Sequence, residues 1–228
     1  MVNRNDDNKC YEPMKNDLLG IGIDAFTDYG DMALNYFLNE TIIGNIPIIG
    51  TFVKAGKIGL SIKNLRFAKN YCTFIQKIRN NEKTQKDLEQ HVNILNNNPK
   101  QMKRELETLI IYLEQYKSVD KIQYMANIYR AFLSCSIGGI QWNQALIFFE
   151  ILDRLLPSDI DDLKKMVIYG AEAEKFNDHS GLLRLSALGL VQYFNGKEEK
   201  YGHNKTGVAK LTVQGKAFYR VITAAKTI

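Results

Sequence analysis

Lysine and arginine residues are interleaved with aromatic rings along the C-terminal tail, residues 181–228 of this 228-residue chain. Such a mixture suits nucleic acid, because phosphates attract the cations and bases can stack on the rings. The rings and further cations of this pattern include Tyr193, Phe194, His203, Lys216, Tyr219 and Arg220. The tail residues that we expect to bind nucleic acid are Arg184, Lys197, Lys200, Tyr201, Lys205 and Lys210. In the alternative interpretation, the tail makes only protein contacts.

A second basic cluster lies in the first third of the chain. Lys63, Arg66 and Lys69 are spaced three residues apart and can share one face of a helix. Tyr71 follows them. We expect this cluster to be a second candidate for phosphate contact.

An apolar segment, TIIGNIPIIGTFVKAGKIGLSIKNLRF, covers residues 41–67. A membrane span needs about 20 mostly apolar residues, and Lys54 and Lys57 interrupt this one. Each lysine at the bilayer centre costs about 2.5 to 3.5 kcal/mol, whereas an Ile, Phe, Val or Leu contributes roughly −0.3 to −0.6 kcal/mol. A lone helix is therefore not expected to insert stably. The expected membrane-contacting residues are Ile42, Ile43, Ile46, Ile48, Ile49, Phe52, Val53 and Leu60.

The charges near this segment are not scattered. Lys54 and Lys57 fall on one stripe of the expected helix, and Asp24, Asp28 and Asp31 form a stripe on the preceding one. Intramembrane charges usually face a bundle interior, so these five residues are predicted to line a pore or an interhelix contact. Three interpretations stay open: a soluble helical hairpin, a helix lying on anionic lipid, or a segment that inserts only on assembly.

Residues for an enzyme site are hard to find in the sequence. The three histidines, His91, His179 and His203, have no ligand at metal spacing, and there is no phosphate-binding glycine loop or nucleophile elbow. We expect no catalytic residues, metal or cofactor. The chain starts without the apolar run of a signal peptide, and its three cysteines are widely spaced, which favours a cytoplasmic setting.

Charge is divided into blocks along the sequence. Residues 1–40 carry −5, residues 41–81 carry +7, residues 82–180 carry −3 and residues 181–228 carry +6. Blocks of this kind predict acidic partners for two separate segments: lipid headgroups, nucleic acid or the protein's own acidic head.

Apolar periodicity predicts a mainly α fold. Helices are expected over residues 17–39, 46–79, 100–116, 119–135, 141–156 and from Ser158. Residues 81–100 are expected to form a polar linker and a short helix. The tail then predicts helix, strand, basic loop, strand and helix, the order of a winged-helix-like α+β unit with its wing at 196–207. The expected domains are a flexible N-terminus (1–16), a helical hairpin (17–80), a helical bundle (81–178) and the winged-helix-like unit (179–228).

The pattern of apolar and glycine positions resembles a group of small bacterial proteins over about residues 17–226. It is carried by NIPIIGTFVKAGKIGLSIKNLRFAKNYCTFIQKI, LIFFEILDRLLPSDIDDL and LLRLSALGLVQYF with VAKLTVQGKAFYRVI. Proteins that look like this are membrane-active effectors of antiphage systems, and the chain is similar to the effector of the two-gene Hailong systems. The resemblance implies a homo-oligomer, a single-stranded DNA oligomer ligand made by a nucleotidyltransferase partner, and a channel held closed by that ligand.

Taken with these patterns, the resemblance implies an antiphage defence effector that oligomerises and forms an ion channel in the membrane or disrupts it. It would be cytoplasmic at rest and at the inner membrane when active. The alternative function is a DNA-binding winged-helix regulator or adaptor, with residues 17–175 serving for dimerisation.

Overall fold

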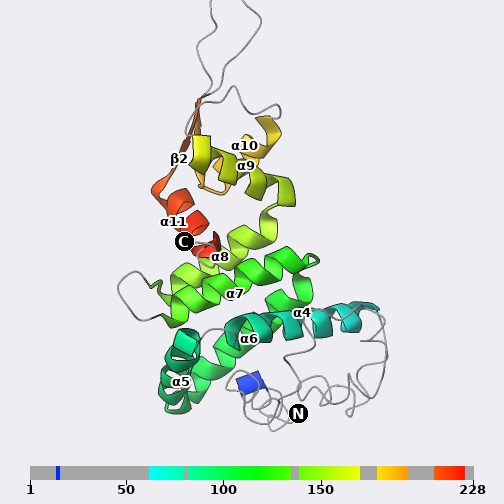
Figure 1. Ribbon diagram of the computed structural model, residues 1–228, viewed down its shortest axis with the longest axis vertical. Helices are drawn as coiled ribbons and strands as arrows, with labels where there is room; N and C mark the ends of the chain where they lie inside the picture. Colours follow the sequence, from blue (N-terminus) through cyan, green and yellow to red (C-terminus); the bar gives the residue numbers. More distant parts are fainter. Residues whose placement is uncertain are drawn as a thin grey trace, which may run out of the picture. The chain divides into compact units, whose positions relative to one another are not determined.

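The computed structural model describes residues 14–15, 62–79, 82–134, 139–169, 179–194 and 208–223. These residues contain eight helices and one two-stranded antiparallel sheet (Figure 1), so the predicted mainly α class is confirmed. The chain divides into two compact units, Met1–Ala145 and Leu146–Ile228.

Four helices make up most of the described part of the first unit: α4 (Ile62–Arg79), α5 (Glu82–Asn96), α6 (Pro99–Gln115) and α7 (Val119–Leu133). The helices expected over 100–116 and 119–135 are thereby confirmed. At their starts, the side chains of Asn98 and Ser118 accept hydrogen bonds from the amides of Gln101 and Asp120. Such N-caps satisfy amides that have no partner within a helix.

The segment after Arg79 differs from the expected polar linker and short helix, because α5 runs for 15 residues. Leu88, Val92 and Leu95 recur one turn apart and are all buried. This apolar stripe packs α5 against α4, α6 and α7. Tertiary burial of one stripe therefore stabilises a helix whose remaining residues, apart from Ile94, are polar.

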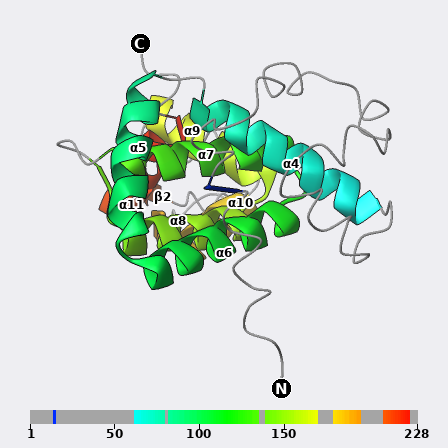
Figure 2. The same ribbon diagram turned by 90° about the horizontal axis from the view of Figure 1, so that it is seen from below.

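Helix α4 packs against the other three helices of this unit, α5, α6 and α7 (Figures 1 and 2). Residues 70–75 are all buried, and six consecutive residues point in every direction around a helix. Two of them, Asn70 and Thr73, are polar. The Asn70 side-chain amide donates to the carbonyl oxygens of Leu113 and Tyr116, each at 2.9 Å. Asn70 thus satisfies carbonyls at the C-terminal end of α6 that lack helical partners.

Helix α8 (Trp142–Arg154) leads into the second unit. The remaining elements are α9 (Pro157–Tyr169), α10 (His179–Ala187), β1 (Val191–Phe194), β2 (Val208–Leu211) and α11 (Val213–Thr223). The strands pair antiparallel, from Val191 opposite Leu211 to Phe194 opposite Val208. The predicted order of helix, strand, strand and helix is therefore observed, while the expected wing at 196–207 lies outside the described residues.

The second unit also contains elements that precede the expected boundary at residue 178. Helix α9 contacts α10, β2 and α11. From α8, Phe148 packs edge-on against Phe218 of α11, with ring centroids 5.3 Å apart. The contacts divide the chain between Ala145 and Leu146, and α8 and α9 both contact α11.

Candidate nucleic-acid interface

A turn between α10 and β1 orients the strand pair. Gly189 has φ +71°, a conformation that glycine adopts without strain. The amide of Leu190 donates to the Leu185 carbonyl at 2.9 Å, and the amide of Gly189 donates to the Ser186 carbonyl at 2.9 Å. These two bonds form a Schellman motif, which ends α10 and turns the chain into β1.

Thr212 holds the start of α11 against this turn. Its hydroxyl accepts a hydrogen bond from the Gly215 amide at 2.8 Å, as an N-cap does, and donates to the Gly189 carbonyl at 2.7 Å. Gly215 itself touches the turn, since a Cβ there would lie 2.0 Å from the Leu190 carbonyl oxygen. The beginning of α11 is therefore tied to the end of α10.

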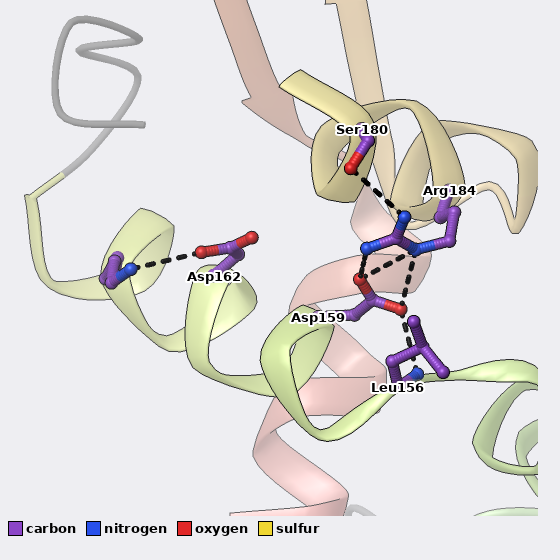
Figure 3. Close-up of polar contacts among 6 residues, drawn as sticks. Leu156, Asp159, Asp162, Ser180 and Arg184 are labelled. Atoms are coloured by element: carbon purple, nitrogen blue, oxygen red, sulfur yellow. Dashed lines mark hydrogen bonds and ion pairs between the residues drawn. The ribbon is translucent and has the colours of Figure 1, made fainter. Parts of the chain in front are cut away.

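An ion pair joins α9 to α10 (Figure 3). Arg184 approaches Asp159 with Nη2 2.7 Å and Nε 3.0 Å from Oδ1. The Asp159 side chain is 0% exposed, and its Oδ2 also accepts the Leu156 amide at 2.8 Å, which caps the start of α9. Arg184 also donates to the Ser180 hydroxyl at 3.2 Å. The buried carboxylate is thus compensated by a cation and an amide.

This pair changes the interpretation of Arg184, which the sequence predicts to contact nucleic acid. In the structure, its guanidinium bonds to Asp159 and joins α10 to α9. Among the α10 residues whose side chains are described, Ser180, Leu183 and Ala187 are exposed, with Leu183 54% exposed. None of these three is an Arg, Asn or Gln of the kind that reads base edges, and the 37% exposed side chain of Arg184 is bonded to Asp159.

Helix α11 presents a different surface. Lys216, Tyr219 and Arg220 lie three and four residues apart, so their side chains are neighbours on one flank. Lys216 and Arg220 are exposed, and Tyr219 is half-buried. On β2, Lys210 is also exposed. We call Lys210, Lys216, Tyr219 and Arg220 the C-terminal basic surface.

The C-terminal basic surface is not neutralised within the described part of the second unit. Residues 179–194 and 208–223 contain no aspartate or glutamate. Among the described carboxylates, none forms an ion pair with Lys210, Lys216 or Arg220. Uncompensated cations attract a polyanion, and Tyr219 adds a ring on which a base can stack.

The second predicted cluster lies on α4. Arg66 and Lys69 are both half-buried. Lys63 belongs to α4, but its side chain lies outside the described residues. The Nε atom of Arg66 is buried and has no hydrogen-bond partner among the described residues.

Several predicted site residues lie outside the described residues. They include all of the membrane-contacting set, namely Ile42, Ile43, Ile46, Ile48, Ile49, Phe52, Val53 and Leu60. They also include the charge stripe of Asp24, Asp28, Asp31, Lys54 and Lys57, and the wing residues Lys197, Lys200, Tyr201 and Lys205. Within the part that the structure describes, no helix is both long and apolar enough to cross a membrane.

A buried polar cluster in the first unit has no counterpart among the predictions. Glu105 is 1% exposed; its carboxylate lies 2.8 Å from His91 Nε2 and accepts the Tyr129 hydroxyl at 2.8 Å. The pKa of Tyr129 is raised well above its usual value, first by burial and then by the charge of Glu105 and their hydrogen bond. These residues come from α5, α6 and α7. The sequence contains only a weak indication that Glu105 is buried, namely its position next to Leu106 on the apolar side of α6.

Searches against family models, curated proteins and solved structures return no match for this chain.

Proposed function

We propose that this protein is an effector of bacterial antiphage defence, controlled by a nucleic-acid ligand that binds its second unit. The observation that carries the proposal is the C-terminal basic surface, where exposed cations and one aromatic ring form no ion pair with a described carboxylate. The ligand is a single-stranded DNA oligomer, supplied by a partner nucleotidyltransferase. The wing cations Lys197, Lys200 and Lys205 would extend the same surface.

The membrane action is assigned to residues 17–67. In the proposed mechanism, loss of the ligand allows copies of the chain to oligomerise at the inner membrane. The isoleucine-rich residues then contact lipid, and Asp24, Asp28 and Asp31 with Lys54 and Lys57 line the interior. This arrangement covers the two lysines whose charge opposes insertion of a single helix.

The side chains that α10 exposes favour the effector function over a regulator that reads DNA sequence. In helix-turn-helix proteins, the recognition helix enters the major groove and reads base edges. Helix α10, which precedes the strand pair, exposes Leu183 and Ala187, and its Arg184 is held by Asp159. Backbone contact through α11 and the wing suits a ligand recognised without base readout.

The test is membrane depolarisation in bacteria that overexpress the full chain, followed with a potential-sensitive dye. Wild type should depolarise the cells, and Ile49→Glu should abolish this effect because a charge replaces a lipid contact. Ile111→Glu is the matched control, since Ile111 is 51% exposed on α6. The proposal is wrong if wild type leaves cells polarised and liposomes intact with and without DNA oligomers.

A DNA-binding regulator remains the second candidate function, favoured by the observed helix, strand, strand, helix order. It predicts sequence-preferring binding to duplex DNA that Lys205→Glu abolishes, together with no effect on liposomes. An electrophoretic mobility assay with duplexes of unrelated sequence separates the two functions.

A further inference from the structure

Helix α4 carries a stripe of cations that is distinct from the C-terminal basic surface. Arg66, Lys69 and Lys77 are separated by three and eight residues, which places them within about 80° around the helix axis at 100° per residue. Lys77 is exposed, and Arg66 and Lys69 are half-buried. We call these three residues the α4 cation stripe.

The stripe has no counter-charge within the described residues. Helix α4 contains no aspartate or glutamate, and no described carboxylate pairs with Arg66, Lys69 or Lys77. Arg66 also holds a buried Nε without a described hydrogen-bond partner. An unpaired buried donor of this kind is costly.

The other sides of α4 fix the direction in which the stripe points. Phe74, Ile75 and Ile78 are fully buried, and Asn70 is bonded to the end of α6. Thr73 lies between the cations and turns its hydroxyl to the Lys69 carbonyl at 2.9 Å. Rotating α4 to bury Lys77 would expose this core, so Lys77 stays at the surface, whereas Thr73 in the middle of the stripe is 7% exposed.

The stripe follows the apolar segment directly in sequence. Arg66 is six residues after Leu60, a separation of at most about 20 Å even in an extended chain. If residues 42–60 engage the bilayer, as the proposed function requires, the stripe begins beside the headgroups. Basic residues next to a membrane segment are attracted to the anionic lipids of the cytoplasmic leaflet.

We propose that Arg66, Lys69 and Lys77 bind the anionic headgroups of the cytoplasmic leaflet and hold the first unit against the membrane. Lipid suits the stripe better than nucleic acid, because the aromatic rings of α4 are not available for stacking on bases. Phe67, Tyr71 and Phe74 are all buried. Single-stranded nucleic-acid sites combine cations with exposed rings.

Vesicle flotation of the nuclease-treated full-length protein tests this proposal. One set of vesicles contains phosphatidylcholine alone, and the other contains phosphatidylcholine with phosphatidylglycerol. Wild type should bind the anionic vesicles more tightly, and added salt should weaken this binding. Each cation near an anionic surface strengthens binding about fivefold, so replacing all three by glutamine should lower the affinity at least tenfold.

The matched control replaces three exposed cations outside the stripe by glutamine: Lys86, Arg104 and Lys164. It removes the same charge and should change vesicle affinity by less than about twofold if the stripe is the site. If the triple stripe variant does not fold, Lys77→Glu at the exposed end should still lower the affinity about fivefold or more.

Four results would overturn the proposal: wild type that does not bind anionic vesicles, wild type that binds both vesicle types equally, stripe variants that bind like wild type, or a control that loses as much affinity. Stripe variants that lose oligonucleotide binding but keep vesicle binding would identify a nucleic-acid contact instead. Depolarisation by wild type tests the proposed function separately. If wild type depolarises cells but the stripe variants bind anionic vesicles as tightly as wild type does, this inference is wrong and the proposed function is not affected.

Discussion

At the residue scale, Glu105 shows how the first unit accommodates a charge in its core. Its carboxylate is bonded to His91 and Tyr129, and the ring of His91 meets Phe132 edge-on at 4.9 Å. A buried carboxylate is costly unless it is hydrogen-bonded, so the two partners make its burial tolerable. The three polar groups therefore link α5, α6 and α7.

The raised pKa of Tyr129 predicts how the free energy of unfolding changes at alkaline pH. Because its pKa is raised in the folded state, the unfolded chain releases the phenol proton first, near pH 10. Between the unfolded and folded pKa values, the folded state binds more protons, so the free energy of unfolding falls as pH rises. Wild type should lose up to about 1.4 kcal/mol per pH unit in this range from Tyr129.

Urea denaturation between pH 8 and pH 11 measures this effect. Tyr129→Phe should be less stable at pH 8 by about 1 kcal/mol, because a hydrogen bond is lost, and should then approach wild type as pH rises. Tyr124→Phe, also on α7, should keep the wild-type slope. Parallel curves for wild type and Tyr129→Phe would contradict the prediction.

At the element scale, the second unit depends on contacts between the ends of its helices. Thr212 and Gly215 hold α11 to the turn after α10, and Asp159 holds α10 to α9. These contacts place the strand pair and α11 on a rigid support. Binding surfaces are more precise when such elements carry them.

The Asp159–Arg184 pair should show a large coupling energy. A double-mutant cycle with Asp159→Asn and Arg184→Gln, followed by urea denaturation, should give about 2 to 3 kcal/mol, because Arg184→Gln leaves a fully buried carboxylate without its cation. The exposed pair of Glu150 and Arg154 should give less than about 1 kcal/mol in the same experiment. Equal coupling in both cycles would refute a special role for the buried pair.

At the scale of the whole molecule, cations are divided between α4 in the first unit and the C-terminal basic surface in the second. The proposals give each set a separate anion: lipid headgroups for α4 and a DNA oligomer for the second unit. The chain's net charge of +5 conceals this division, because acidic residues of other segments offset the basic ones.

DNA binding by the second unit should depend on salt in proportion to its phosphate contacts. Replacing Lys216 and Arg220 by glutamine should reduce the slope of log affinity against log salt by about 1.4, at roughly 0.7 per contact with single strands. Fluorescence anisotropy with a labelled single-stranded oligonucleotide measures this slope. Lys86→Gln with Arg104→Gln should leave it unchanged, and an unchanged slope in the α11 variant would exclude these contacts.

Local patterns in the sequence were sufficient for much of the secondary structure. Apolar periodicity predicted α6 and α7 to within about two residues, and turn residues predicted the two strands between helices. The extent of α5 was underestimated, because many of its residues are polar and its stability depends on burial of Leu88, Val92 and Leu95. The membrane segment and the wing remain predictions.

The sequence by itself determined the mainly helical class, the order of elements in the tail and the blocks of charge, since each follows from residues that are neighbours in the chain. Only the tertiary structure decided which polar groups meet. Arg184 and Asp159 are 25 residues apart, and Glu105 and Tyr129 are 24 apart. Spacing along a helix identifies a face but not the element packed against it. For that reason, Arg184 looked like a phosphate ligand, whereas its guanidinium joins two helices.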